Sequence, residues 1–454
     1  MIFELMHKNI PVADISLNEE GRMEHILAIR DLRHFPFGTE PRTNPLDSTE
    51  LKRWWDNRQI PFSRNGLANV RGVVLPEGAP TSLLVLHASG LSLSDSYWIR
   101  QKGSQTRYEE VNFFENRFSY DLGDALLLGK QKDDVIYLSP DATTDGDLAK
   151  RWKIRNGKRV LLKSGIKPYF YQVYNEVIAS FVCAYLDVPH ADYRLVRDDG
   201  MLLCECEDFV SYSQDFVTAY MLYRGCHKAN DESNYSYLLR LYEELGIEGA
   251  RKNVDQMLLI DYLLGNEDRH LNNFGLLRDA NSLEFLGVAP LFDTGSCLGY
   301  ELTDEELESS SPRPWKPFRT ASHVSPLDYI DELPLDHKEA LLSLPRALKE
   351  YLQRDYEGLS PKRKRAIASF VSSRVHEVVK HFGLELAPTF GLSKTQQSIM
   401  DYARTRGGRI DNAGDLASSL GIAKLTALRN IALLVEQGYL RRDGSKKTGH
   451  WTLL

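Results

Sequence analysis

The chain has 454 residues, of which 42% are hydrophobic and 26% charged, and its 56 basic and 63 acidic residues leave a formal net charge of −7. This length predicts at least two hydrophobic cores, and the composition excludes fibrous and disordered proteins. No apolar run approaches the roughly 18 residues of a membrane span, charge interrupts any signal peptide within residues 1–8, and five cysteines are too few for a disulfide scaffold. We therefore expect a cytoplasmic protein that makes no membrane contact.

Residues 1–130 predict an N-terminal subdomain of mixed strands and loops. Short β-prone runs between proline- and glycine-bearing turns predict strands at Val70–Leu75, Ser82–Leu86 and Ala125–Leu128. We find no motif in this stretch that carries chemistry. Its expected role is therefore that of a scaffold or an interaction surface.

Residues 131–210 predict a sheet with one long helix against it. Asn156-Gly157 is a strong hairpin signal between two apolar runs. Val173, Val177 and Phe181 have the spacing of one helix face. The predicted elements are strands at Trp152–Ile154 and Val160–Lys163, a helix at Tyr169–Leu186, and a second hairpin of Tyr193–Val196 and Met201–Cys206.

Residues 211–386 predict a mainly helical region around one polar loop, residues 267–273. Before the loop we expect a helix over Val254–Leu264, with Asn253 as N-cap and Gly265 as its stop. The remaining predicted elements are strands at Phe274–Leu277 and Leu283–Leu286, and a later helix that Ser360 caps, Pro361 opens and Gly383 closes.

The polar loop and the segment after the predicted hairpin carry three residues typical of phosphoryl transfer. That reaction needs a carboxylate beside the attacking hydroxyl, and an amide and a second carboxylate to hold Mg²⁺ on the phosphates. Asp268, Asn273 and Asp293 follow the order and spacing that protein kinases use for these roles. A capped loop and a turn carboxylate remain the alternative interpretation.

A kinase also needs groups upstream that hold the phosphates. Lys163 ends a predicted strand and Glu176 lies in the next helix, which fits the usual lysine–glutamate pair. Gly146 and Lys150 precede the hairpin in a loop suited to cover phosphates, although it has no G-x-G-x-x-G pattern. The alternatives are that Lys163 is only an edge-strand charge and Glu176 only a solvated helix residue.

With these motifs in place, residues 5–385 resemble the HipA-like serine/threonine kinases of bacterial toxin–antitoxin systems. The resemblance implies an α+β, bilobal protein-kinase-like fold with an N-terminal mixed β subdomain, and ATP and Mg²⁺ as cofactors. The motifs that carry it are Met6-His7-Lys8, Trp54-Trp55, Leu93 to Trp98, Thr144 to Leu148, Lys150-Arg151-Trp152, Leu162-Lys163, Gly265 to His270, and Phe292-Asp293.

The resemblance also assigns roles to individual residues. It implies Asp268 as the catalytic base, Asn273 and Asp293 as Mg²⁺ ligands, and Lys163 as an ATP ligand. Family members phosphorylate their own phosphate loop and thereby silence the kinase, and many have an antitoxin partner. The residues implied at the adenine-contacting hinge are Glu205, Cys206 and Glu207, and those implied as self-phosphorylation acceptors are Thr143 and Thr144.

The loop reads Asp268-Arg269-His270, where the best-known members have Asp-Asn-His. Phosphoinositide kinases share the Asp-Arg-His reading, so transfer to a lipid or another small molecule stays open. A DNA-binding regulator whose kinase lobe only senses nucleotide is the alternative from another class. The protein substrate is not identified by the sequence.

Residues 387–454 predict a basic module on an acidic body. Between Lys394 and Leu454 ten basic and five acidic residues give +5, which leaves −12 for the rest of the chain. Helices at Lys394–Thr405, Ala413–Leu420 and Leu425–Gln437, then a hairpin with Asp443-Gly444 at its tip, predict a winged helix-turn-helix.

A winged helix of this kind would bind double-stranded DNA and associate with the nucleoid; a plain solvated face and a protein-binding module are the alternatives. The residues predicted to contact DNA are Thr426, Arg429, Asn430, Arg441, Arg442, Lys446 and Lys447.

Overall fold

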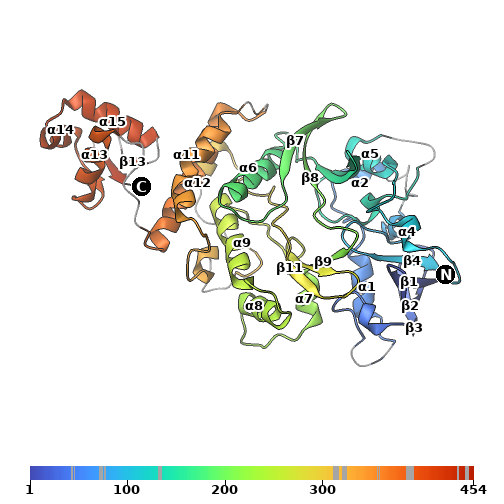
Figure 1. The fold of residues 1–454 in the computed structure, drawn as a ribbon. Coiled ribbons are helices and arrows are strands. Elements are labelled where there is room, and N and C mark those ends of the chain that lie inside the picture. Colours follow the sequence, from blue (N-terminus) through green and yellow to red (C-terminus); the bar gives the residue numbers. More distant parts are fainter. Residues whose placement is uncertain are drawn as a thin grey trace.

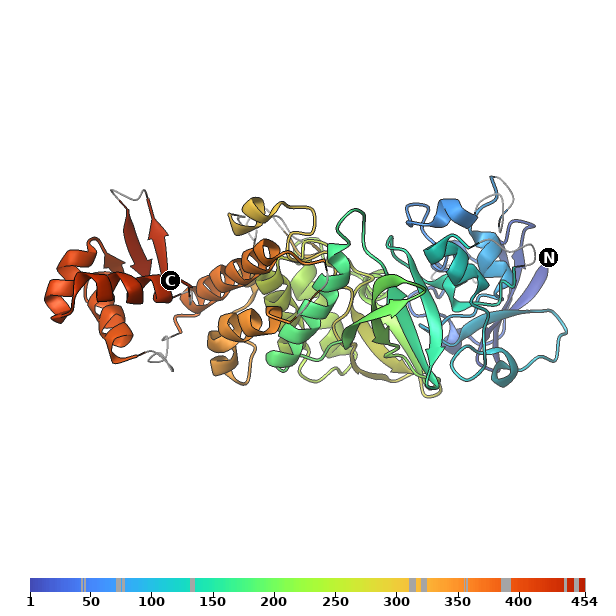
Figure 2. The same ribbon diagram turned by 90° about the horizontal axis from the view of Figure 1, so that it is seen from above.

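The computed structural model describes residues 1–41, 44, 46–70, 75, 78–130, 135–309, 316–319, 325–354, 356, 358–384, 393–436, 439–444 and 449–453. Its elements form an α+β arrangement, as predicted, with β1–β4 near one end of the molecule and α13–α15 at the other (Figure 1). The view from above shows the same elongated order (Figure 2). The sheet of β5–β8 and the helices α6 and α9 lie between these ends.

The N-terminal region is built on an antiparallel sheet with strand order β3-β2-β1-β4. Its core forms because alternate strand residues are apolar and pack on the two buried tryptophans of α1, Trp54 and Trp55. The elements are β1 Ile2–His7, β2 Ile10–Leu17, β3 Met23–Ile29, α1 Thr49–Asp56, α2 Leu67–Val70, α3 Ser82–His87, β4 Tyr97–Gln101, α4 Tyr108–Val111 and α5 Asp121–Leu128.

Two of the three strands predicted for this region are wrong, and the third lies mostly outside the described residues. Ser82–Leu86 lies in α3, Ala125–Leu128 lies in α5, and Val70 ends α2, while residues 71–74 lie outside the described residues. A buried apolar run of four to six residues has no periodicity that separates a strand from one face of a short buried helix. Packing against neighbours then decides the conformation.

The middle of the chain forms a four-stranded antiparallel sheet of order β5-β6-β8-β7, covered by α6. The predicted hairpins and helix are confirmed within a few residues. Asn156 and Gly157 take left-handed φ angles of 51° and 80°, which this tight turn requires. The elements are β5 Lys150–Arg155, β6 Lys158–Lys163, α6 Tyr171–Tyr185, β7 Tyr193–Asp198 and β8 Met201–Glu207.

The helical region holds the largest hydrophobic core and a three-stranded sheet of order β11-β10-β9. Helix α9 begins at Ala250, one turn before the predicted start, because Gly249 and not Asn253 is its N-cap. Gly265 ends it as predicted, and Ser360 caps α12 by accepting from the Arg363 N–H. The elements are β9 Gln214–Thr218, α7 Ala219–Gly225, α8 Asn234–Glu244, α9 Ala250–Leu264, β10 Gly275–Asp279, β11 Phe285–Val288, α10 Asp304–Glu308, α11 Lys338–Leu352 and α12 Pro361–His381.

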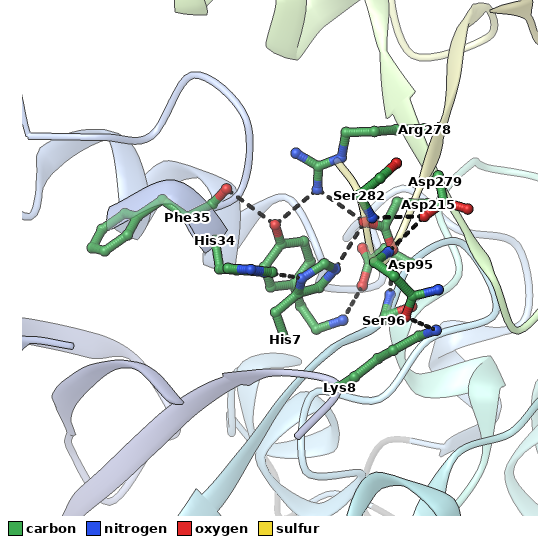
Figure 3. Close-up of polar contacts among 12 residues, drawn as sticks. His7, Lys8, His34, Phe35, Asp95, Ser96, Asp215, Arg278, Asp279 and Ser282 are labelled. Atoms are coloured by element: carbon green, nitrogen blue, oxygen red, sulfur yellow. Dashed lines mark hydrogen bonds and ion pairs between the residues drawn. The ribbon is translucent and has the colours of Figure 1, made fainter. Parts of the chain in front are cut away.

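A buried polar cluster joins the N-terminal sheet to β9 and β10 (Figure 3). Asp215 of β9 lies at its centre: its Oδ2 is 2.9 Å from His7 Nε2 and accepts from Arg278 Nη2 at 2.9 Å. The Ser96 N–H donates to Asp215 Oδ1 at 2.9 Å, and Arg278 also donates to the hydroxyl of Tyr97. Because these groups are buried and paired, they fix the N-terminal sheet against the hairpin that follows the polar loop, residues 267–273.

The C-terminal region has its own small core and a sheet of order β12-β14-β13. The three predicted helices and the hairpin agree with the structure to within one residue at each described end. The elements are α13 Lys394–Arg404, β12 Arg409–Ile410, α14 Ala413–Leu420, α15 Lys424–Glu436, β13 Leu440–Asp443 and β14 His450–Leu453. Across the described ranges, no single helix has the length and apolar character to cross a membrane; one sharply bent pair, α14 with α15, passes on length and composition only.

Candidate active site

Lys163, at the end of β6, is the centre of a buried ion cluster. Its Nζ lies 2.9 Å from Glu176 Oε1 on α6 and 2.7 Å from Asp293 Oδ1, and it donates to the Tyr193 hydroxyl at 3.0 Å. Lys163 is 3% exposed and Glu176 is fully buried. The structure therefore excludes both the edge-strand interpretation of Lys163 and the solvated interpretation of Glu176.

The opposite charges in this cluster stabilise each other's ionised forms. Burial alone would lower the pKa of Lys163, but Asp293 and Glu176 outweigh it and raise that pKa well above its ordinary value. Burial alone would raise the pKa of Asp293, but Lys163 and then Lys150 hold it below its ordinary range. Lys163 and Asp293 are therefore both ionised at neutral pH, and the Asp293 carboxylate faces the cavity.

Arg269 holds the polar loop, residues 267–273, through contacts on its buried side. Its guanidinium, fully buried, pairs with Asp261 of α9 at 2.9 and 3.0 Å. It also donates to the carbonyl oxygen of Asn273 at 3.2 Å and to that of Phe292 at 2.5 Å. One side chain thus ties the helix, the loop residue Asn273 and the residue before Asp293 together, a scaffold role that the sequence did not predict.

Asp268 lies at the open side of the loop. It is 51% exposed on its side chain, and its Oδ1 is 3.1 Å from Lys316 Nζ. It does not line the main cavity; it neighbours a shallow hollow that His270, Asn272, Tyr220 and Lys316 line. An acceptor hydroxyl can reach Asp268 from solvent at this point.

The loop before β5 closes one end of the cavity. Gly146 has a left-handed φ of 95°, and a Cβ there would collide with Lys150 Nζ, which donates to the Asp145 carbonyl at 2.7 Å. Burial, then the nearby Arg64 and Lys163, lower the pKa of Lys150 to about 7. Thr143 is buried and donates to the Leu91 carbonyl, and Thr144 donates to the Pro140 carbonyl at 2.7 Å.

One cavity collects most of the predicted cofactor-binding residues. Asn273 and Asp293 both line it, and amide and carboxylate oxygens are ligands that Mg²⁺ accepts, so this pair fits a metal held jointly with phosphates. Among the described residues no cluster of three His, Cys, Asp or Glu side chains is arranged to hold a metal alone. The lining residues that were predicted are Thr143, Thr144, Gly146, Lys150, Lys163, Cys206, Glu207, Asn273 and Asp293.

The side chain of Glu205 does not line the cavity. Because successive strand residues face opposite sides, its side chain points away from the Cys206 side and is absent from the cavity wall. Its carboxylate is buried and paired with Arg194 and Arg155, each at 2.6 Å. Glu176 also lies outside the wall, behind Lys163.

The predicted DNA-contacting residues fall on two elements. Thr426 and Arg429 are exposed on α15, and Asn430 donates to the Thr426 carbonyl of its own helix. On β13, Arg441 pairs with Asp443 at 2.8 Å and Arg442 lies over the Trp451 ring. Lys446 and Lys447 lie outside the described residues.

Comparison with known proteins finds similarity both in sequence and among solved structures. No family model matches the chain. Over 131 residues, 28% of this chain, it is 57% identical to the serine/threonine-protein kinase CtkA of Helicobacter pylori strain J99, and the match spans 40% of that relative's length. The predicted resemblance to serine/threonine kinases is thereby confirmed at the level of sequence.

The solved structures are more distant. The crystal structure of the Helicobacter pylori proinflammatory kinase CtkA matches 52% of this chain and 95% of its own, with a TM-score of 0.41 and 19% identity. HipA, in a Shewanella oneidensis MR-1 complex of HipA, HipB and operator DNA, matches 86% of this chain and 100% of its own, with a TM-score of 0.47 and 15% identity. At these TM-scores the likeness carries no argument.

Proposed function

We propose that this chain is a Mg²⁺- and ATP-dependent serine/threonine protein kinase of the HipA-like type. The observation that carries the proposal is the ion cluster of Lys163, Glu176 and Asp293, at the wall of a cavity that Asn273 also lines. The stretch shared with a serine/threonine-protein kinase supports the same activity. A degenerate, nucleotide-sensing lobe would not need to keep this set intact.

The residues divide the work of phosphoryl transfer between them. ATP supplies the phosphoryl group, and Mg²⁺ neutralises the charge that moves with it. Lys163, kept protonated by its two carboxylate partners, binds the phosphates, and Asn273 and Asp293 hold the metal. Asp268, exposed to solvent, orients and deprotonates the acceptor hydroxyl. Gly146 and Lys150 cover the phosphates from the opposite side.

The buried position of Arg269 bears on the choice of acceptor. In the Asp-Arg-His reading, an arginine that faced the acceptor would favour an anionic lipid headgroup. Here the guanidinium donates its hydrogen bonds to Asp261 and to two carbonyl oxygens on the buried side of the loop. Protein hydroxyls are therefore the proposed acceptors, and a lipid or other small molecule is the alternative that a substrate panel tests.

We also propose self-phosphorylation in the phosphate loop, at Thr143 or Thr144. Both hydroxyls are engaged by backbone carbonyls, and Thr143 is buried, so a phosphate on either side chain is incompatible with the present loop position. Modification should thus displace the loop and silence the kinase.

For the C-terminal module we propose a winged helix that binds double-stranded DNA, beside an antitoxin partner for the kinase body. Exposed Thr426 and Arg429 on α15 and the arginines of β13 support it. One observation favours a protein partner instead: α15 also exposes Leu425, at 77% exposure, and Leu428. Binding of labelled duplex by the full chain, with its salt dependence, separates the two.

The experiment that tests the kinase assignment is intact-mass analysis and peptide mapping of the purified chain after incubation with Mg²⁺ and ATP. The wild type should gain phosphate on Thr143 or Thr144, and Asp268→Ala should gain none. Phosphate on both proteins would contradict the role of Asp268. Phosphate on neither, with no transfer to a protein panel, would contradict the protein-kinase proposal and favour the small-molecule kinase or the DNA-binding regulator.

A further inference from the structure

A short segment of the N-terminal region, Ser63–Asn65, contacts the phosphate loop at residues 144–147. Arg64 is 3% exposed, its Nε donates to the Gly146 carbonyl at 2.9 Å, and its Nη2 donates to the Thr144 carbonyl. The Asn65 N–H donates to the Asp147 carbonyl at 2.8 Å, and the Ser63 hydroxyl donates to Asp147 Oδ1 at 2.5 Å. Four hydrogen bonds therefore hold a loop that lies about 80 residues further along the chain.

The Ser63–Asn65 segment is itself fixed by hydrogen bonds within its turn and by packing against α5. Its turn is closed by the Arg64 N–H bond to the Pro61 carbonyl at 3.0 Å and the Leu67 N–H bond to the Arg64 carbonyl at 3.1 Å. Gly66 has a left-handed φ of 93°, and a Cβ there would collide with the Leu126 carbonyl of α5. Because the Ser63–Asn65 segment is itself fixed, its hydrogen-bond donors can restrain the phosphate loop. Donors on a mobile segment would move with the loop.

The geometry of the bonds orients the loop for phosphate. In a trans peptide the C=O of one residue and the N–H of the next point in opposite directions. Since Arg64 draws the carbonyls of Thr144 and Gly146 toward itself, the N–H groups of Asp145 and Asp147 point away from it. No described residue accepts a hydrogen bond from either N–H. These two free donors flank Gly146, whose own N–H donates to Asp145 Oδ1 at 2.6 Å, and free backbone N–H groups in such a turn are suited to bind phosphate oxygens.

The charge of Arg64 acts in the same place. Burial lowers its pKa only to about 10, so the guanidinium stays charged at neutral pH, and of the neighbouring cations it lowers the pKa of Lys150 most. Its Nη1 is buried, and no group in the described part of the chain accepts from it. Arg64 does not line the cavity, so its effect on a ligand passes through the loop that it holds.

We propose that Arg64, with Ser63 and Asn65, is a positioning residue that holds the phosphate loop in its nucleotide-binding form, so that the N-terminal subdomain completes the nucleotide site. This inference rests on the proposed kinase function, because it assumes that the cavity binds a nucleoside triphosphate. It assigns to the N-terminal region a part in the reaction that its sequence, predicted to be a scaffold or an interaction surface, did not indicate.

The test compares the affinities of the full-length chain for Mg²⁺·ATP and for adenosine, measured by calorimetry. Arg64→Lys keeps the charge but cannot make both carbonyl bonds, so the Kd for Mg²⁺·ATP should rise about tenfold while the Kd for adenosine changes less than about twofold. Ser63→Ala, a milder change, should weaken ATP binding about twofold to threefold in the same direction. The matched control is Arg100→Lys, whose guanidinium pairs with Glu4 and the Thr106 carbonyl on the same region but away from the loop.

The outcomes separate this proposal from the one beneath it. A wild type that binds neither ligand would overturn the proposed function, and with it the proposal that Arg64 positions the phosphate loop. If the wild type binds ATP and both Arg64→Lys and Ser63→Ala bind it equally well, only the proposed positioning role of Arg64 is overturned. Equal losses for ATP and adenosine, or an equal loss in Arg100→Lys, would also overturn it, since they would mean general destabilisation. Kinetics on active enzyme should agree: a raised KM for ATP with kcat changed less than about threefold.

Discussion

The cleft and the N-terminal region meet at residues 144–147, and they hold that loop by different means. On the cavity side two side chains donate to Asp145: Lys150 Nζ to its carbonyl at 2.7 Å and Asn272 to its Oδ2 at 3.3 Å, and the charges of Asp293 and Lys163 act on Lys150 in turn. On the N-terminal side the contacts run from Ser63, Arg64 and Asn65 mostly to backbone carbonyls. We infer from this difference that the cavity provides the charged groups for phosphoryl transfer. The N-terminal region fixes the conformation of the loop that binds the phosphates.

Removing the metal-holding carboxylate should have the largest effect. Asp293→Asn keeps the shape of the side chain, and asparagine tolerates the left-handed φ of 57° found there, but it removes the charge that binds Mg²⁺. We expect kcat for phosphate transfer to fall by at least about 10³-fold. The matched control is Asp187→Asn, an exposed aspartate at a φ of 55°, which should leave activity unchanged. Activity above a tenth of wild type in Asp293→Asn would break the assignment of the cleft.

The attachment of the N-terminal sheet to β9 and β10 should stabilise the protein through Asp215, and this contribution to the unfolding free energy should depend on pH. Asp215→Asn leaves Arg278 buried without its counter-charge, which should cost about 3 kcal/mol of unfolding free energy, measured by urea unfolding followed by tryptophan fluorescence. Burial alone would raise the pKa of Asp215, but His7 and Arg278 hold it below its ordinary value of 3.8. The carboxylate therefore contributes its stability above about pH 4 and loses it as the pH falls further.

The stability difference between wild type and Asp215→Asn should accordingly shrink when the pH is lowered below about 4. Asp187→Asn serves again as the control and should change the unfolding free energy by less than about 0.5 kcal/mol. A difference that stays constant across this range would show that the charge of Asp215 is not what holds the N-terminal sheet to β9 and β10.

The smallest predicted effect concerns Lys150, where both regions act on one side chain. Its pKa of about 7 reflects burial and then the charge of Arg64, so the free protein loses this proton near neutrality. If phosphate binds the ammonium form, the affinity for Mg²⁺·ATP should fall about tenfold between pH 6 and pH 8. Lys150→Arg stays charged, so its affinity should be nearly flat over the same range. Equal pH profiles for the two proteins would contradict the prediction.

Local spacing in the sequence predicted much of the cleft. The positions of Asp268, Asn273 and Asp293 lie within 26 residues and around one hairpin, so turn and strand signals place them. Lys163 and Glu176 lie on consecutive elements, so their pairing follows from a strand that leads into a helix. The C-terminal helices were predicted well because each has a clear amphipathic pattern and a cap or glycine at its end.

The sequence did not predict the contacts that depend on distant segments. Nothing near Arg64 or Arg269 distinguishes them from other arginines; their roles exist only because Gly146 and Asp261 are brought beside them by the fold. The strands wrongly predicted at Ser82–Leu86 and Ala125–Leu128 have the same cause, since short apolar runs take the conformation that their neighbours select. The side chain of Glu205 lies outside the cavity wall because side chains alternate along β8.

The measurement that tests the central claim most directly compares binding and transfer in one variant, Asp268→Ala. Asp268 lies outside the cavity wall and is exposed, so the account predicts a Kd for Mg²⁺·ATP within about threefold of wild type and a kcat reduced by at least about 10²-fold. Retained phosphate transfer by Asp268→Ala, at a rate near that of wild type, would contradict the account.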